Sequence, residues 1–286
     1  MAIRNNGNNE GGRIGNRPRR QTNHRFRNNA RANNGNRLRD GKEVYLSVII
    51  PAYNEEWRLA QTLTAVGDYL KNQAYSYEII VVNDGSKDKT AQIAEGLIGK
   101  VARLKLIDNQ KNRGKGFVVR QGLMAAKGRV RLFMDSDNSA PIEEIEKLLP
   151  YFKENYGIVI GSRHALGAKI ALSQPLFRQF MGWGYRVLAD ILAGTWGIRD
   201  TQCGFKTITA PVAVQILPLC KIDGFVFDAE ILMLAKMKGY RVAEVGVVWK
   251  SDARHTVEIS SMFKMFLDLL RVRANKIKGI YGTRTK

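Results

Sequence analysis

Short apolar runs alternate with segments of helical spacing along residues 44–161, and this alternation constrains the fold more than any other feature. The apolar runs predict buried strands at 44–51, 77–82, 103–108, 130–134 and 157–161. Helical spacing predicts helices at 55–70, through 93–97, at 114–126 and from Pro141 onward. Strands that alternate with helices predict an α/β fold with a mainly parallel sheet and right-handed crossovers.

The pattern changes after residue 162. Residues 175–198 are rich in aromatic residues, leucine and glycine, but three charged residues interrupt them, and charges are costly in lipid. We therefore expect a helix at the protein or membrane surface. Residues 204–209 and 241–248 predict further strands, with a helix between them. No transmembrane helix is expected, because no stretch of about 18 uncharged apolar residues is present.

Polar residues follow three of the predicted strands. Asn54 and Glu55 follow the first, Asp84 the second, and Asp135 and Asp137 the fourth. In open α/β sheets, ligands bind beyond the carboxyl ends of the strands. These ends therefore predict a ligand site.

Asp135-Ser136-Asp137 predicts a metal site. Side chains two positions apart in an extended segment point the same way, so two carboxylates can converge on one hard cation. Such a cation can neutralise a diphosphate leaving group. The alternative is a solvated turn that only ends a strand.

Two further features favour nucleotide binding. The Asp84 carboxylate can accept a hydrogen bond from a base or a ribose, although it can also cap the next helix. Ser86 and Asp88 are equally suited to that cap. Residues 112–116 form a basic, glycine-rich turn in which backbone amides and Lys115 can face phosphate.

Three motifs in this order, at 48–56, 82–86 and 135–137, resemble family 2 glycosyltransferases of the GT-A fold. Three later segments, at 161–163, 200–206 and 224–230, resemble dolichyl-phosphate β-glucosyltransferases and related polyprenyl-phosphate sugar transferases. The resemblance covers roughly residues 44–275. It predicts a GT-A catalytic domain at 43–257, with a nucleotide-sugar-binding α/β fold.

The resemblance implies roles for matching positions. The nucleotide-sugar donor would be held by Pro51, Tyr53, Glu55, Asp84, Lys115, Asp135 and Gln202, with Gln202 lining the sugar pocket. Asp135 and Asp137 would hold Mg²⁺ or Mn²⁺. Arg163 and Arg178 would bind the lipid phosphate, and Asp228 falls where many members place an acidic general base.

Physical chemistry qualifies the role of Asp228. A lipid monophosphate has a second pKa of about 6, so it is already a nucleophilic anion near neutral pH. Asp228 can then orient the sugar instead of removing a proton. We expect single displacement with inversion, in which the metal, in-line positioning and Arg163 supply most of the catalysis.

The resemblance implies UDP-glucose as donor and a polyprenyl or dolichyl phosphate as acceptor. A GDP-mannose-dependent transfer to the same kind of lipid is the alternative enzyme. A nucleic-acid-binding protein that uses the N-terminal arm is the alternative of another class. That arm has only Phe26 as an aromatic residue for base stacking, which disfavours nucleic acid as a partner.

Residues 1–42 predict a disordered basic arm. Residues 1–40 carry ten arginines against Glu10 and Asp40, and the whole chain has a net charge of +20. With almost no apolar residues, the arm cannot offset the entropy of ordering. It attracts polyanions such as anionic lipid, or it is a solubilising tail. No apolar segment follows these arginines, so no secretory signal is expected.

Residues 258–286 predict an amphipathic membrane-interface helix and a tail. Lys264, Asp268, Arg271, Asn275 and Lys278 form one polar stripe. The apolar residues that lie off this stripe are Ile259, Met262, Phe263, Phe266, Leu269 and Leu270. A helix of this kind binds a membrane interface or packs on the core. We expect a cytoplasmic protein bound peripherally to the cytoplasmic face of a membrane, and the two cysteines, which have no metal-type spacing, agree with a reducing compartment.

Overall fold

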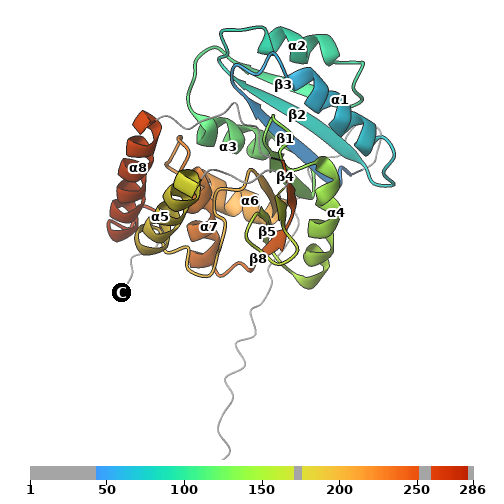
Figure 1. Ribbon diagram of the computed structural model, residues 1–286. Helices are drawn as coiled ribbons and strands as arrows, with labels where there is room; N and C mark the ends of the chain where they lie inside the picture. Colours follow the sequence, from blue (N-terminus) through green and yellow to red (C-terminus); the bar gives the residue numbers. More distant parts are fainter. Residues whose placement is uncertain (1–42, 171–175, 251–258, 283–286) are drawn as a thin grey trace, which may run out of the picture. The chain divides into compact units, whose positions relative to one another are not determined.

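A seven-stranded sheet forms the centre of the computed structural model, which describes residues 43–170, 176–250 and 259–282. Its strands are β1 (Leu46–Ala52), β2 (Tyr77–Asp84), β3 (Leu104–Asn109), β4 (Val130–Met134), β5 (Ile158–Ser162), β7 (Phe205–Thr209) and β8 (Val242–Gly246). The order across the sheet is β3-β2-β1-β4-β7-β5-β8 (Figure 1). Strand β7 is antiparallel to both neighbours, and the other neighbouring pairs are parallel. The prediction of a mainly parallel α/β sheet is confirmed.

Helices connect these strands and cover the sheet. The α-helices are α1 (Leu59–Leu70), α2 (Thr90–Leu97), α3 (Lys115–Ala125), α4 (Ile145–Leu148), α5 (Leu176–Leu192), α6 (Ala210–Ile216), α7 (Phe227–Met237) and α8 (Ile259–Ile277). The 3₁₀ helices are η1 (Ile142–Glu144), η2 (Leu149–Glu154) and η3 (Leu217–Leu219). Two short strands, β6 (Lys169–Ile170) and β9 (Val248–Trp249), pair in parallel beside the main sheet.

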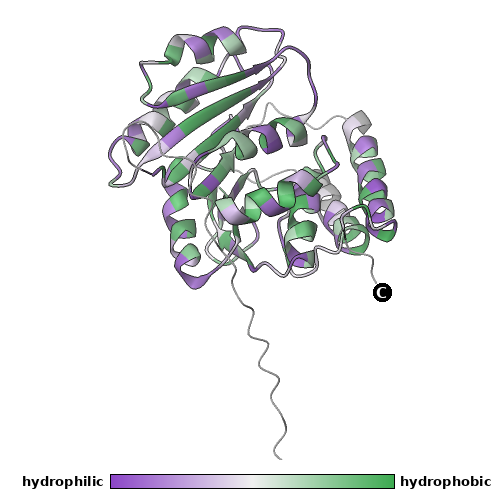
Figure 2. Cartoon of the chain, turned by 180° about the vertical axis from the view of Figure 1, so that it is seen from behind, coloured by the Kyte–Doolittle hydropathy of each residue, from purple (hydrophilic) through white to green (hydrophobic). Residues whose placement is uncertain are grey.

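The side chains of β1 alternate between the two faces of the sheet and so divide the core in two. Val48 and Ile50 pack with apolar residues of α1, α2 and α4. Ile49 points the other way, into a cluster built by α3, α5, α6, α7 and α8. Because both faces are covered by helices, the strands are almost continuously hydrophobic (Figure 2).

Two predicted helices differ from the observed ones at their boundaries. The helix predicted from Glu55 begins at Leu59, because residues 56–58 form a turn in which the carbonyl oxygen of Glu55 accepts from the N–H groups of Arg58 and Leu59, at 3.1 and 2.9 Å. The helix predicted from Pro141 is divided among η1, α4 and η2, so only four of its residues, 145–148, are α-helical.

The strand predicted at 241–248 is two strands. Strand β8 pairs with β5, and β9 pairs with β6. The chain bends at Gly246, where an added Cβ would lie 2.4 Å from the carbonyl oxygen of Leu166. The backbone of residues 166–168 thus packs against Gly246, the last residue of β8, just before β9 begins.

The amphipathic helix predicted at 258–278 is present as α8. One side of it contributes Met265, Leu269 and Val272 to the core, so the alternative of a helix packed on the core holds for that side. Phe263 and Phe266 remain 64% and 39% exposed. The helix therefore packs on the core and also keeps an apolar surface.

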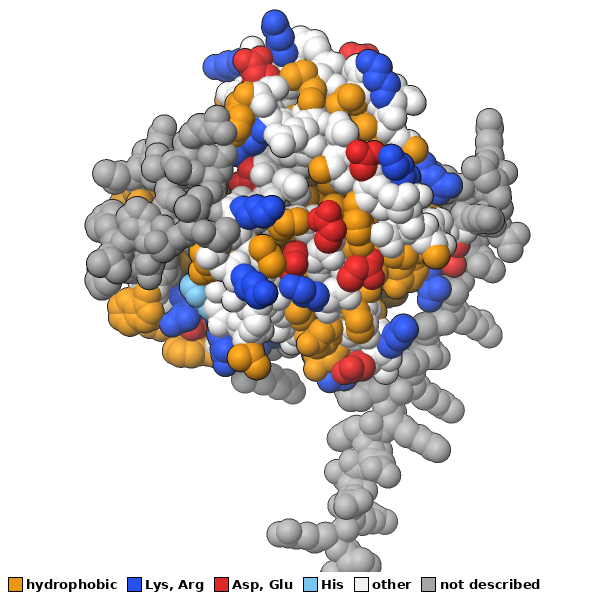
Figure 3. All heavy atoms as spheres, turned by 45° about the vertical axis from the view of Figure 1, so that its right-hand side comes forward, with side chains coloured by type: hydrophobic (Ala, Val, Ile, Leu, Met, Phe, Trp, Pro, Cys, Tyr) orange, Lys and Arg blue, Asp and Glu red, His pale blue; other side chains and the backbone are white. Residues whose placement is uncertain are grey.

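Helix α5 lies within the segment predicted as a surface helix, and Trp183 and Trp196 there are 55% and 62% exposed. None of the helices within the described ranges is long and apolar enough to cross a bilayer. On the face drawn in Figure 3, basic and acidic side chains lie near one another among apolar ones. The basic arm predicted at 1–42 lies outside the described residues.

Candidate active site

The carboxyl ends of β2, β1 and β4 are neighbours in the sheet, and polar residues follow each of them. Asp84 ends β2, Asn54 and Glu55 follow β1, and Asp135 follows β4. The order of the chain reverses beside β1, which is where α/β sheets open a crevice beyond the strand ends. The residues predicted from the sequence to form a ligand site are therefore brought to one edge of the sheet.

Asp135 joins β4 to the segment that precedes β7. Its N–H donates to the carbonyl oxygen of Gly204 at 3.0 Å. Its carboxylate lies against the same glycine, so a Cβ added there would come within 1.9 Å of Oδ2. The other carboxylate oxygen, Oδ1, lies 2.6 Å from Nζ of Lys115 at the start of α3. Only glycine at position 204 leaves room for this arrangement.

Residues 135–138 do not continue β4, so the prediction that Asp135 and Asp137 project from an extended segment is wrong. Ser136 and Asp137 form a turn, and Oδ1 of Asp137 accepts a hydrogen bond from the Ser139 N–H at 2.8 Å. The side chains of Asp135 and Asp137 are nevertheless only 23% and 18% exposed. They are not the solvated turn that the alternative predicted.

Three carboxylates stabilise the charged ammonium of Lys115. Burial alone would lower the pKa of Lys115, but Asp135, Asp228 and Asp137 together raise it above its ordinary value. Lys115 is therefore a permanent cation among three acidic residues, of which Asp135 and Asp137 follow β4 and Asp228 lies at the start of α7. One lysine among three aspartates leaves an excess of negative charge, which suits a site that binds an anionic ligand together with a metal cation.

The donor set at Asp135 and Asp137 fits a hard cation. Carboxylate oxygens are the ligands that Mg²⁺ and Mn²⁺ prefer. Within the described ranges, no group of three or more His, Cys, Asp or Glu side chains is arranged as a complete metal site. Mg²⁺ is commonly bound by one or two carboxylates plus substrate phosphates, and the two aspartates match that type of site.

Asp84 fixes the glycine-rich turn before α3. Its carboxylate accepts hydrogen bonds from the N–H groups of Arg113 and Gly114, at 2.7 and 2.9 Å. Burial raises the pKa of Asp84 although these two hydrogen bonds oppose the shift. The first N–H of α2, that of Thr90, donates instead to Oδ1 of Asp88, at 2.9 Å. The nucleoside contact predicted for Asp84 stays a prediction.

Glu55 is buried and pairs with Arg58, whose Nη2 donates to Oε1 at 2.6 Å. Nη1 of Arg58 lies 4.0 Å from Oδ2 of Asp137, so Glu55 orients a cation beside the metal-type turn. Pro51 is buried in β1, whereas the Tyr53 ring is 40% exposed at the end of the strand. Tyr53 is thus accessible for stacking, and Arg58 is a site residue that the sequence did not reveal.

Arg163 follows β5 and is held by the buried Asp200. Nε and Nη2 of Arg163 donate to the two carboxylate oxygens, each at 2.8 Å. The guanidinium carbon of Arg163 lies over the face of the Trp249 ring, 5.1 Å from the ring centroid. Gln202 donates its N–H to Asp200 at 3.3 Å and so belongs to the same loop. Arg178 lies on α5, but its side chain is outside the part of the chain that the structure describes.

Asp228, the second residue of α7, forms a buried ion pair with Lys206 of β7, Nζ to Oδ1 2.8 Å. Lys206 also donates to the carbonyl oxygen of Cys203. Burial raises the pKa of Asp228, and the two lysines Lys206 and Lys115 oppose that shift. Lys206 therefore links the 200–204 loop to the acidic residue, a role that its position in an apolar strand did not suggest.

The model of the family described as Glycosyl transferase family 2 matches residues 47–203. A dolichyl-phosphate β-glucosyltransferase of Trichomonas vaginalis is 38% identical over 255 residues, which are 85% of this chain and 75% of that protein. The dolichyl-phosphate β-glucosyltransferase of Saccharomyces cerevisiae is 32% identical over 277 residues, 88% of this chain and 81% of that protein.

A solved structure with the same fold is glucosyl-3-phosphoglycerate synthase from Mycobacterium tuberculosis, in complex with Mn²⁺, UDP and glucosyl-3-phosphoglycerate. The TM-score is 0.60 at 18% sequence identity, over 82% of this chain and 80% of that chain. At that identity the likeness concerns the fold.

Proposed function

This chain belongs to glycosyl transferase family 2, and we propose that it transfers glucose from UDP-glucose to a dolichyl or polyprenyl phosphate. The family matches and the shared fold confirm the resemblance of the motifs at 48–56, 82–86 and 135–137. The names of the relatives support the choice of sugar and lipid. The observation that carries the proposal is the group of carboxylates around Lys115: Asp135 and Asp137 after β4, and Asp228 at the start of α7.

The donor occupies the ends of β1, β2 and β4 in this proposal. Pro51, Tyr53 and Glu55 border the nucleoside, and Asp84 holds the turn that presents Lys115 to the diphosphate. Asp135 and Asp137 would hold Mg²⁺ or Mn²⁺, which when bound neutralises the diphosphate leaving group. Arg58 lies beside Asp137 and would add positive charge next to the departing diphosphate.

The acceptor phosphate approaches from the side of β5 and β7. Arg163, fixed in direction by Asp200, and Arg178 would offset the repulsion between two anions. Gln202 lies in the loop that borders the sugar. Asp228 would orient the sugar, because the phosphate, with a second pKa of about 6, needs no strong base. The phosphate oxygen attacks the anomeric carbon opposite the leaving diphosphate, so the product has inverted configuration.

Membrane contact is the part of the proposal that α5 and α8 support. Trp183 on α5, Trp196 in the loop after α5 and Phe263 on α8 are more than half exposed, and aromatic side chains favour membrane interfaces. The arginines of residues 1–40 add attraction to anionic lipid. We propose peripheral binding at the cytoplasmic face of a membrane.

Binding and transfer assays test this proposal. Calorimetry with UDP-glucose and with GDP-mannose, each with and without Mn²⁺, should show metal-dependent binding of UDP-glucose. Transfer of labelled glucose to a polyprenyl phosphate should then give a β-linked product. Preference for GDP-mannose would overturn the choice of donor, and binding of neither would overturn the proposal.

Asp137→Ala should reduce metal-dependent transfer by about 100-fold or more, because a metal can contribute several kcal/mol to the transition state. Asp68→Ala removes a carboxylate that is 62% exposed on α1 and is the matched control. Equal activity in both variants would refute the metal assignment.

A further inference from the structure

A fully buried carboxylate, Glu230 of α7, lies at the centre of a network that no predicted role explains. It accepts hydrogen bonds from the N–H groups of Lys221 and Ile222, at 2.8 and 3.0 Å, and from the hydroxyl of Tyr281, at 2.7 Å. Tyr281 follows α8 and is itself fully buried. A buried carboxylate persists only when its oxygens are well paired, so these three donors stabilise one local geometry.

Residues 221–224, the clamp loop, cover the first turn of α3. The carbonyl oxygen of Asp223 accepts hydrogen bonds from the N–H groups of Gly116 and Phe117, at 2.8 and 3.2 Å. A Cβ at position 116 would lie 2.8 Å from the carbonyl oxygens of both Ile222 and Gly224. The N–H groups of a first helical turn have no partners within the helix, and here the clamp loop supplies them.

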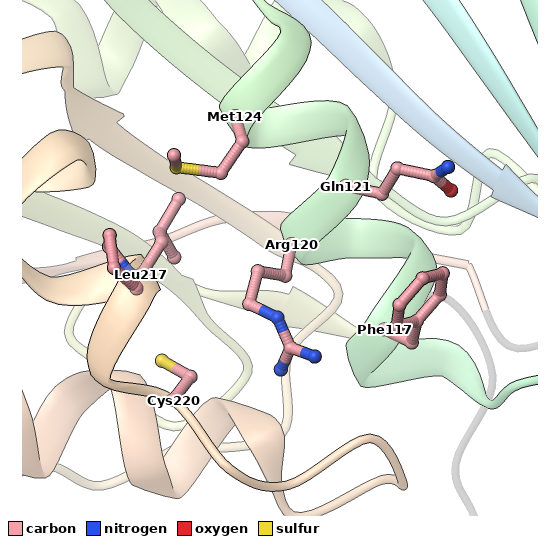
Figure 4. Close-up of a pocket in the computed structure, with 7 residues that line it drawn as sticks. Phe117, Arg120, Gln121, Met124, Leu217 and Cys220 are labelled. Carbon is pink, nitrogen blue, oxygen red and sulfur yellow. The ribbon is translucent and has the colours of Figure 1, made fainter.

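The side chain of a third α3 residue, Arg120, strengthens this contact. Arg120 points from α3 toward the chain that follows Cys220 (Figure 4). Its Nη2 lies 2.5 Å from Oδ1 of Asp223, and its Nη1 donates to the carbonyl oxygen of Ile222 at 3.4 Å. The clamp loop and the start of α3 are therefore joined through both backbone and side chains.

Lys115 immediately precedes Gly116, and its ammonium lies 2.6 Å from Asp135. We infer that Tyr281 and Glu230 are positioning residues that hold the clamp loop and, through it, Lys115 at the donor site. The contact with the helix start stands on geometry alone, and its effect on the donor rests on the proposed function. Helix α8 adds a second support, because its Asp268 lies against Gly224, where a Cβ would be 2.7 Å from Oδ2.

Tyr281→Phe removes the hydroxyl and keeps the ring, so it tests the clamp with little loss of packing. We expect hydrogen exchange at the amides of Gly116 and Phe117 to become about threefold to tenfold faster, the effect of one lost hydrogen bond. The dissociation constant for UDP-glucose should rise by a similar factor. Glu230→Gln, which keeps the size but leaves one backbone N–H without its acceptor, should give at least the same changes.

Val272→Ala is the matched control, since it removes apolar side-chain atoms of α8 from the core and keeps the hydroxyl of Tyr281 and the carboxylate of Glu230. It should lower the melting temperature and leave exchange at residues 116–117 and UDP-glucose affinity unchanged. The inference is overturned if Tyr281→Phe leaves this exchange unchanged, or if Val272→Ala accelerates it equally. Faster exchange with unchanged UDP-glucose affinity would also overturn it, because the clamp would then not reach Lys115.

Failure of the proposed function is distinguishable from failure of this inference. A wild-type protein that binds no UDP-glucose refutes the donor assignment, and hydrogen exchange at residues 116–117 then decides alone whether the clamp exists.

Discussion

The ammonium of Lys115 on α3 lies 2.6 Å from Oδ1 of Asp135 after β4, so a helix start and a strand end meet at the centre of the site. The pair is only about one-quarter exposed, with side-chain exposures of 26% and 23%. A diphosphate that enters with its own cation offers Lys115 a second anionic partner. We propose that Lys115 thus connects the carboxylates to the donor phosphates.

Lys115→Met should raise the KM for UDP-glucose by about tenfold or more, because a hydrogen bond to a charged group contributes about 1.5–3 kcal/mol. Steady-state kinetics at saturating acceptor measure this change. Lys71→Met removes a lysine that is 59% exposed at the C-terminal cap of α1 and should leave the KM unchanged. An unchanged KM in the Lys115 variant would remove Lys115 from the donor site.

Gly204→Ala should abolish most transfer activity. The added Cβ would lie 1.9 Å from Oδ2 and 2.2 Å from Cγ of Asp135, so the carboxylate must leave its position. Isothermal titration with Mn²⁺ and UDP, together with a transfer assay, measures the loss. Gly96→Ala in α2 meets no atom within 4 Å and is the control, expected to keep full activity and to gain up to about 1 kcal/mol of stability. Wild-type activity in Gly204→Ala would contradict the observed packing of Asp135.

The sheet and the strand-end residues were predictable because both signals are local. Apolar runs of strand length identified β1 to β5, and the position of Asp84 and Asp135 at the ends of such runs identified the edge of the sheet where they lie. The motifs around them identified the family. The exact orientation of Asp137 was not predictable, because a turn after β4 replaces the extended backbone on which that prediction depended.

The partners of the site residues could not be read from the sequence. Arg163 and Asp200 are 37 positions apart, and Lys206 reaches Asp228 from a different element, so each pairing depends on the tertiary fold. Arg58 was also missed, although its position three residues after Glu55 next to a helix start is a local signal that could have found it. The burial of one side of α8 could likewise not be predicted from the sequence, because an amphipathic pattern does not show what covers its apolar residues.

Asp200→Asn should destabilise the protein in a pH-dependent manner. Burial alone would raise the pKa of Asp200, but the hydrogen bonds and charge of Arg163 outweigh it and hold the pKa well below its usual range. A depressed pKa stabilises the folded state above the unfolded-state value of about 3.9, and this contribution is lost as the pH falls toward the folded-state value.

The cost of Asp200→Asn should therefore be about 3 kcal/mol at pH 7, as for other broken buried pairs, and should shrink below about pH 3.9. Urea unfolding between pH 7 and pH 3 measures the difference. Asp68→Asn, at an exposed ion pair with Lys71, should show no such dependence. A difference that stays constant down to pH 3 would refute a depressed pKa at Asp200.

The combined substitutions Phe263→Ser and Phe266→Ser should weaken membrane binding by about tenfold or more, since each exposed ring that enters lipid contributes up to about 1.5–3 kcal/mol. Flotation with phosphatidylserine-containing vesicles measures binding. Salt screens the attraction between the arginine-rich residues 1–40 and anionic lipid, so the difference should be clearest at about 0.5 M salt. Ile98→Ser, at a 48% exposed position after α2, is the control and should bind as the wild type does. If the wild-type protein fails to float at low salt, the proposed membrane binding is refuted. If the double variant binds as well as the wild type, α8 is not the membrane contact.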